Sequence, residues 1–217
     1  MRIVNTSIIT KVVSELCIKA NNVLPDDIIN SINNAYNSET AINAKNALKT
    51  IKRNIEVSKE LKIPLCQDTG IAIVFVEIGQ DVFLEGDNIN LAINKGVRKG
   101  YLEGLLRCSV VSDPLNRINT NDNTPAIIHI EIVEGDKIKI TVAPKGFGSE
   151  NMSSIKMFTP SATTDDIINF VVDTVKNAGS NPCPPIIVGV GIGGNFEQCA
   201  LLSKKSLLSR IYISTEI

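Results

Sequence analysis

A short polar loop, PLCQDTG at residues 64–70, is the first place in this 217-residue chain where chemistry could occur. It puts the thiol of Cys66 beside the amide of Gln67 and the carboxylate of Asp68, which suits a metal ligand or a reactive thiol. A purely structural role has equal weight on these residues alone, with the polar side chains bonded to the backbone and Gly70 supplying a positive φ. The loop therefore predicts a functional site and leaves its chemistry open.

A second cysteine, Cys183, lies in the sequence NPCPP at residues 181–185, with a proline on either side. Proline fixes its own φ, so the thiol is held in one direction. A metal ligand needs such a fixed direction, whereas a cysteine that only packs does not. The other cysteines, Cys17, Cys108 and Cys199, favour buried packing, and the chain has no CxxC pair.

The turn GVGIGG at residues 189–194 matches the GxGxxG pattern of dinucleotide-binding proteins. In those proteins the pyrophosphate lies on the N-terminus of the following helix. Two interpretations stay open, because the turn could bind a nucleotide or its glycines could let the helix pack closely on the preceding strand. The packing interpretation is at least as well supported, since a dinucleotide-binding fold continues into further βα units.

Arginine suits the binding of a carboxylate, because its planar guanidinium can donate two parallel hydrogen bonds. Arg107 and Arg117 are candidates, although spacing alone favours a surface position for each, as it does for Asp113 and Lys145. His129, the only histidine, lies in an apolar run and is expected in the core. A single histidine also excludes a multi-histidine metal site.

The elements that would position these residues follow from hydrophobic periodicity and turn residues. Helices are predicted over about 8–20, from Pro25, from about Ser38 to Leu61, over 88–101, over 164–178 and after the glycine turn. Strands are predicted over 71–79, in a hairpin around Glu134–Asp136, before the turn at 189–194 and in RIYISTEI (210–217), with a polar loop over 112–125. This order predicts a single α+β (mixed α/β) domain over 1–217, with a helical N-terminal layer packed on a mixed β-sheet.

Composition excludes several classes of function. Lys and Arg (22) balance Asp and Glu (23), and the net charge of −1 argues against a nucleic-acid binder. Aromatic residues make up 4% and tryptophan is absent, so stacking platforms for single strands are not expected. No apolar run approaches the ~20 residues of a membrane span, and the N-terminus lacks the apolar core of a signal peptide. We therefore expect a cytoplasmic protein that does not enter a membrane.

Four long segments, taken together, resemble one family. They are PLCQDTGIAIVFVEIGQ, LRCSVVSDPLNRINTNDNTPAIIHIEIVEGD, PKGFGSENMSSIKMFTPS and NPCPPIIVGVGIGGNFEQCALLSKKSLL. In this order they resemble the α subunit, or N-terminal domain, of the class I iron–sulfur-dependent fumarate hydratases and L(+)-tartrate dehydratases, over about residues 5–208. Four motifs in the family's order are far more specific than GxGxxG alone.

The resemblance implies a hydro-lyase that converts fumarate to malate, or tartrate to oxaloacetate, with a 4Fe–4S cluster. In this family three cysteines hold three irons, and the fourth iron stays open as a Lewis acid for the substrate. Cys66 and Cys183 match two of the cluster ligands. We therefore expect the single domain over 1–217 to be a catalytic domain of the α type.

The resemblance also implies roles around the substrate. Gln67 and Asp68 match catalytic positions close to the substrate, and Arg107 matches its carboxylate-binding side. Gly146 and Gly148 of the KGFG turn match the same side and offer backbone N–H groups. Which of the two glycines touches the substrate stays open.

The family's third cluster cysteine lies beyond a glycine-rich segment that this chain does not contain, and Cys17, Cys108 and Cys199 do not match its context. We therefore expect a chain truncated at its C-terminus relative to the family, with a broken or labile cluster on its own. The resemblance further implies a β subunit or C-terminal domain that supplies more arginines and the catalytic base, and a homodimer of α parts. An inactive remnant or interaction module of the same fold is the alternative.

Overall fold

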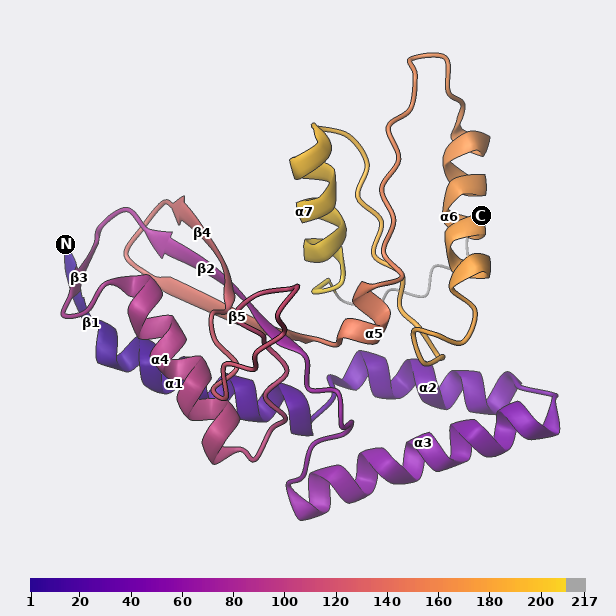
Figure 1. Cartoon of the computed structure of the whole chain (residues 1–217), viewed down its shortest axis with the longest axis horizontal. Coiled ribbons are helices and arrows are strands. Elements are labelled where there is room, and N and C mark those ends of the chain that lie inside the picture. Colours follow the sequence, from indigo (N-terminus) through magenta and orange to yellow (C-terminus); the bar gives the residue numbers. More distant parts are fainter. Residues whose placement is uncertain (210–217) are drawn as a thin grey trace. The chain divides into compact units, whose positions relative to one another are not determined.

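The computed structural model describes residues 1–209, so the strand expected over 210–217 lies outside the described residues. The chain divides into two compact units, Met1–Lys145 and a second that begins at Gly146 (Figure 1). Helices and β-sheets occur together, which confirms the mixed α+β class. Across residues 1–209 there is no helix with the length and apolar character needed to cross a membrane.

Three helices follow one another near the N-terminus, as the periodicity predicts. They are α1 (Thr6–Asn22), α2 (Asp26–Ser38) and α3 (Ile42–Leu61). α1 begins after Asn5, whose side-chain oxygen accepts a hydrogen bond from the N–H of Ser7 at 2.9 Å.

Two short strands in the first unit were not predicted. β1 (Arg2–Asn5) pairs in parallel with β3 (Val82–Glu85) in a two-stranded sheet. Segments this short give too few residues for a period-2 pattern to stand out. Their pairing is therefore a result of the tertiary structure.

The main sheet has three strands, β2 (Ile71–Gly79), β4 (Ile127–Val133) and β5 (Ile138–Lys145). Their order is β4–β2–β5, with β2 parallel to β4 and antiparallel to β5, so the sheet is mixed as expected. The hairpin predicted around Glu134–Asp136 is wrong, because β4 and β5 both pair with β2 and not with each other.

β2 takes the central place because it is apolar on both of its faces. Val74 and Ile73 point to opposite faces and are 0% and 2% exposed. The turn after β4 consequently crosses the end of β2, where a Cβ on Gly79 would lie 2.2 Å from the carbonyl oxygen of Gly135. A glycine is required at that crossing.

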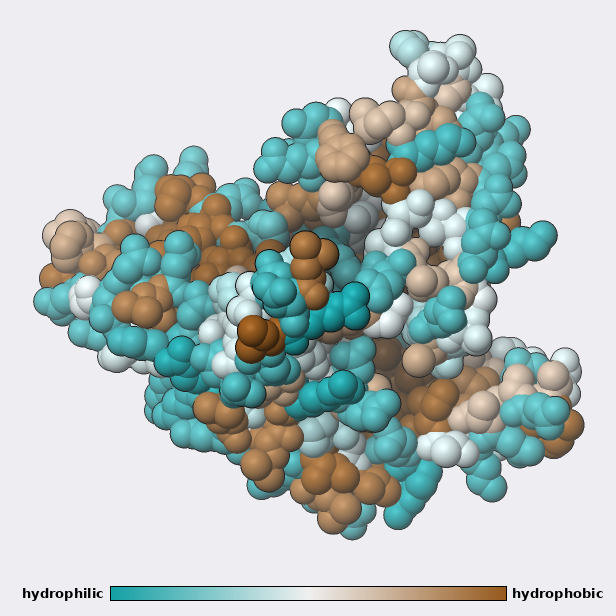
Figure 2. Space-filling model, in the orientation of Figure 1, coloured by the Kyte–Doolittle hydropathy of each residue, from teal (hydrophilic) through white to brown (hydrophobic). Residues whose placement is uncertain are grey.

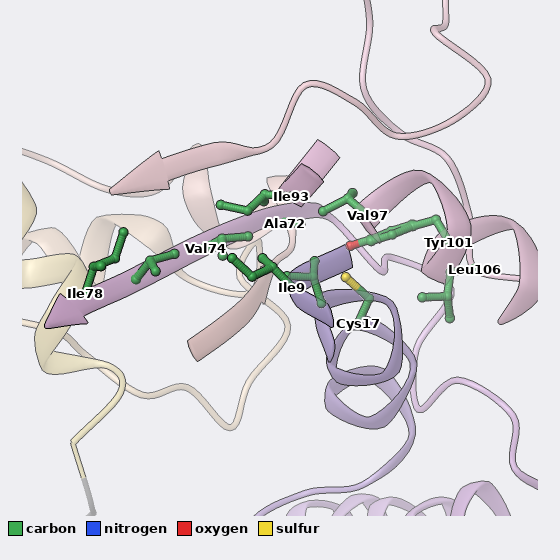
Figure 3. Close-up of a cluster of buried hydrophobic side chains, with 11 residues drawn as sticks. Ile9, Cys17, Ala72, Val74, Ile78, Ile93, Val97, Tyr101 and Leu106 are labelled. Carbon is green, nitrogen blue, oxygen red and sulfur yellow. The ribbon is translucent and has the colours of Figure 1, made fainter. Parts of the chain in front are cut away.

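The core of the first unit lies between β2 and the helices α1 and α4 (Ile89–Glu103) (Figure 3). Its buried members are Ile9, Val13, Cys17, Ala72, Val74, Val76, Ile78, Ile93, Val97, Tyr101 and Leu106. Each large apolar side chain buried in this way contributes about 1.5–3 kcal/mol. Figure 3 shows the hydroxyl of Tyr101 directed inward, toward Cys17. A buried hydroxyl needs a hydrogen-bond partner, and here the partners lie in the Cys66 loop.

The second unit contains α5 (Phe147–Glu150), α6 (Thr164–Ala178) and α7 (Phe196–Ser206). α6 begins where the sequence predicts, with a capping box formed by Thr163 and Asp166. In it the N–H of Thr163 donates to the Asp166 carboxylate at 2.8 Å.

The strand expected before the glycine turn is not formed. Within the described part of the chain, residues 186–192 have no strand partner, although they are rich in β-branched residues. Several of their side chains are exposed, among them Ile187 and Ile192. Hydrophobic residues reach the surface in both units (Figure 2).

Candidate functional site

The Cys66 loop joins α3 to β2 and is anchored at its start. The N–H of Leu65 donates to the carbonyl of Asn21 at 2.9 Å, and the side chain of Asn54 donates to the carbonyl of Leu65 at 2.8 Å. Beyond this anchor Cys66 is exposed, and its sulfur accepts a hydrogen bond from the N–H of Asp68 at 3.4 Å. Hydrogen bonds to cysteine sulfur are among the features that tune iron–sulfur ligands.

Arg107 is tied to this loop through Thr69. The Thr69 hydroxyl donates to the carbonyl of Arg107 at 2.9 Å, and Thr69 itself is buried. The hydroxyl of Tyr101 in turn donates to the carbonyl of Thr69 at 2.9 Å and lies 3.3 Å from that of Gly70. Gly70 has the predicted positive φ, at 63°. The structure therefore brings the predicted loop and Arg107 together.

The side chains expected to act near a substrate are open to solvent. Gln67 and Arg107 are exposed, and Asp68 is half-buried. An amide, a carboxylate and a guanidinium thus lie on neighbouring backbone segments of the first unit, where a polar ligand could reach them.

The remaining polar candidates of the first unit have structural contacts. The carboxylate of Asp113 accepts hydrogen bonds from two backbone N–H groups of the turn that follows it. The side chain of Arg117 donates back to the carbonyl of Pro114 at 3.3 Å. His129 is half-buried and stacks on Phe75, with ring centroids 4.9 Å apart. The contacts of Asp113 and Arg117 agree with the structural positions that the sequence favours, whereas His129, expected in the core, is only half-buried on the edge strand β4.

Of the three cysteines expected to be buried, Cys17 is buried, whereas Cys108 and Cys199 are half-buried. Cys17 is fully buried, and burial raises the pKa of its thiol to about 12. Burial also raises the pKa of Cys108, and the nearby Asp122 carboxylate adds to the effect. The thiol of Cys199 donates to the carbonyl of Phe196 at 3.4 Å. A metal ligand must be a thiolate, so the raised pKa values of Cys17 and Cys108 disfavour coordination by these two residues.

Cys183 has a left-handed backbone, with φ at 58°, which is uncommon for a residue other than glycine. Its side chain is exposed, and its N–H donates to the carbonyl of Ser180 at 3.1 Å. Such a conformation costs about 1–3 kcal/mol, and strained backbone of this kind clusters at functional sites. The constrained backbone of Cys183 is thus compatible with the predicted fixed direction of its thiol.

The Cys183 loop packs against the KGFG turn of the same unit. A Cβ added to Gly148 would lie 3.5 Å from the carbonyl oxygen of Asn181. The side chain of Asn181 also contacts Met152, donating to its sulfur at 3.5 Å. These contacts bring Gly148 near the loop that carries Cys183.

Gly146 caps the short helix α5 and is held there by a backbone hydrogen bond. Its carbonyl accepts a hydrogen bond from the N–H of Glu150 at 3.1 Å. The carboxylate of Glu150 forms an ion pair with Lys204 of α7. The predicted site residues thus form two groups, with Cys66, Gln67, Asp68 and Arg107 in the first unit and Gly146, Gly148 and Cys183 in the second.

The glycine turn before α7 is used for close packing. A Cβ on Gly189 would lie 2.4 Å from the carbonyl oxygen of Ser203, and a Cβ on Gly191 would lie 2.2 Å from that of Cys199. The N-terminus of α7 is capped by Asn195, whose side chain accepts from the N–H of Gln198 at 2.8 Å. These contacts favour the packing interpretation over nucleotide binding.

In residues 1–209, no three His, Cys, Asp or Glu side chains are close enough to hold a metal ion. Cys66 and Cys183 are nevertheless chemically suited to bind iron through their sulfur atoms, because both thiols are free and exposed. A cluster held by three cysteines needs one more thiolate than this pair provides.

Thr69 and Tyr101 help to build the site and carry no clear signal in the sequence. Thr69 reads as one more turn residue, and Tyr101 reads as one more apolar residue of α4. The one available hint is a tyrosine on an otherwise aliphatic helix face, because a buried hydroxyl must find a polar partner.

The family model for fumarate hydratase (Fumerase) matches residues 10–216. A protein of Methanocaldococcus jannaschii designated a candidate L(+)-tartrate dehydratase subunit alpha is 44% identical over 209 residues, which cover 94% of this chain and 73% of the relative. The L(+)-tartrate dehydratase alpha subunits of Escherichia coli K12 and Shigella sonnei are 28% identical over 207 residues, which cover 94% of this chain and 68% of each relative. A match of this extent means that the chain belongs to the fumarate hydratase (Fumerase) family.

Proposed function

We propose that this chain is the α-subunit part of an iron–sulfur-dependent hydro-lyase that adds water to, or removes it from, a small dicarboxylate. Membership of the family and the names of the relatives support a hydro-lyase. The observation that carries the proposal is the 2.9 Å hydrogen bond from Thr69 to Arg107. It holds the loop with the exposed Cys66 thiol beside the backbone of Arg107, whose side chain would bind a carboxylate. Fumarate and tartrate are the substrates to test first.

Cys66 and Cys183 would hold the 4Fe–4S cluster, together with a third thiolate from another source. The backbone N–H that faces the sulfur of Cys66 and the constrained backbone of Cys183 both support a ligand role. When bound, such a cluster supplies an open iron that acts as a Lewis acid on a substrate oxygen.

The other residues would bind and orient the dicarboxylate. Arg107 would bind one carboxylate through two parallel hydrogen bonds. Gly146 and Gly148 would offer backbone N–H groups without a side chain in the way. Gln67 would donate a hydrogen bond to the substrate from its amide, and the carboxylate of Asp68 would accept one from a hydroxyl group.

A partner would complete the site. The relatives are named alpha subunits, which supports a β subunit beside this chain. We extend the proposal to a homodimer of α parts and to a cytoplasmic enzyme, on the basis of the four motifs shared with the family.

The test is anaerobic reconstitution of the full chain with iron and sulfide, alone and with a partner β subunit. We expect the chain alone to hold little or labile cluster by visible absorbance, and fumarate hydration to need the partner. In the complex with the partner, Cys66→Ser and Cys183→Ser should abolish the absorbance of the cluster. The matched control Cys199→Ser should keep it.

Two results would contradict these expectations. An absorbance that survives Cys66→Ser and Cys183→Ser would overturn the ligand assignment. Stable cluster binding with full hydration activity by the chain alone would overturn the need for a partner.

A further inference from the structure

Asn123 lies near the end of the polar loop 112–125 and is completely buried, with 0% exposed. Its side-chain amide donates to the carbonyl of Gly70 at 3.0 Å. Its side-chain oxygen accepts hydrogen bonds from the N–H groups of Ser109 at 2.7 Å and Val110 at 3.2 Å. One side chain thus joins three segments that are far apart in the sequence.

These partners place Asn123 at the two segments that build the first half of the candidate site. Gly70 follows Asp68 closely in the chain, and Ser109 follows Arg107 closely. The oxygen and the nitrogen of the buried amide are both bonded, so the amide cannot move without leaving polar groups unpaired. Asn123 therefore limits how far the Cys66 loop can move relative to the Arg107 segment.

A role of Asn123 in the turn of the backbone does not by itself explain why its side chain is buried. Asn123 has a left-handed backbone with φ at 57°, a conformation that asparagine tolerates. Asn121, in the same loop, has φ at 64° and remains exposed. Both residues turn the chain, and only Asn123 bonds to the site segments through its side chain.

We propose that Asn123 is a positioning residue, which sets the Cys66 thiol and the Asp68 carboxylate relative to Arg107. It acts through the backbone of Gly70 and Ser109. What the positioned groups bind rests on the function proposed above, whereas the positioning is a property of this chain.

Hydrogen exchange of the full chain, read by mass spectrometry, tests the positioning with Asn123→Gly and the matched control Asn121→Gly. Glycine keeps the left-handed backbone at both positions and removes only the side chain. In Asn123→Gly we expect peptides over 65–71 and 107–111 to exchange about tenfold faster, because the N–H groups of Ser109 and Val110 lose their acceptor and the Cys66 loop loses the bond that holds it at Gly70. Peptides of α1, and all peptides of Asn121→Gly, should keep wild-type rates. Equal exchange in the two variants, or faster exchange throughout the protein, would overturn the proposal.

Asn123→Asp is the second variant, for the case in which Asn123→Gly does not fold. Its side chain still accepts from the N–H groups of Ser109 and Val110, while an ionised carboxylate has no donor for the carbonyl of Gly70. At alkaline pH we expect faster exchange over 65–71 alone. Wild-type exchange there would overturn the proposal.

The cluster provides a separate readout. In protein reconstituted together with the partner β subunit, we expect a chelator to bleach the visible absorbance about tenfold faster in Asn123→Gly than in the wild type or in Asn121→Gly. Equal bleaching in all three would overturn the positioning of Cys66. A wild-type complex with the β subunit that takes up no cluster would instead overturn the proposed function, and hydrogen exchange would still decide the role of Asn123.

Discussion

The hydroxyl of Thr69 donates a 2.9 Å hydrogen bond to the carbonyl of Arg107, across 38 residues of sequence. This bond joins the loop that begins β2 to the segment that follows α4. The Cys66 loop and the Arg107 segment are therefore held together, and substitutions that remove their contacts should lower the stability of the protein.

Replacing Thr69 by valine removes the donor and keeps the shape of the side chain. The carbonyl of Arg107 then loses its partner, and we expect the free energy of unfolding to fall by about 1 kcal/mol. Urea unfolding measures this change. Thr69→Ser keeps the hydroxyl and is the control, so equal losses in the two variants would show that the hydrogen bond is not the cause.

Tyr101→Phe removes the hydroxyl that donates to the buried carbonyl of Thr69, while the carbonyl of Gly70 still accepts from Asn123. We expect a loss of about 1–3 kcal/mol in the free energy of unfolding, because the Thr69 carbonyl is left unpaired. The half-buried Tyr36, which contacts Lys45 and Lys52 through its ring, provides the matched control. Tyr36→Phe should unfold like the wild type, and an equally small effect of both changes would contradict the prediction.

Cys17 makes stability depend on alkaline pH. Its pKa rises from 9.0 to about 12 in the folded protein, because the buried site disfavours the thiolate. The folded state therefore holds this proton more tightly, and the stabilisation is complete below pH 9 and is lost as pH rises toward 12. We expect a contribution of about −1.4 kcal/mol per pH unit across this window.

Urea unfolding at a series of pH values checks the Cys17 effect. Cys17→Ala should remove that part of the pH slope, although the cavity also lowers the stability at every pH. Cys108→Ala should lower the slope by less, because the pKa of this thiol is raised in the same direction by a shallower burial. Parallel pH curves for Cys17→Ala and the wild type would contradict the assignment.

Arg107→Lys tests the carboxylate-binding role in the proposed enzyme. Lysine keeps the charge and loses the planar pair of donors, so we expect KM for fumarate to rise about tenfold or more. Steady-state kinetics of the reconstituted complex measure this, with Arg117→Lys as the control. An unchanged KM in Arg107→Lys would remove Arg107 from the substrate site.

Much of the helical structure and the loops that carry Cys66 and Cys183 could be predicted, because these signals are local. Apolar periodicity sets a helix within a few turns, and the Thr163–Asp166 capping box lies within one turn of α6. The residue types around the two cysteines likewise support the prediction that their thiols are metal ligands, which stays a prediction.

Only the tertiary structure decided which segments pair. The residues on either side of Gly135 alternate as a hairpin would, and β2 lies between the two strands because both of its faces are apolar. The hydrogen bond from Thr69 to Arg107 and the burial of Asn123 could not be predicted from the sequence either, since the bonded residues are distant in the sequence. A hydrogen bond between residues so far apart in the sequence forms only when the packed core brings their two backbone segments together. Local residue patterns do not determine the distance between those segments in the folded protein.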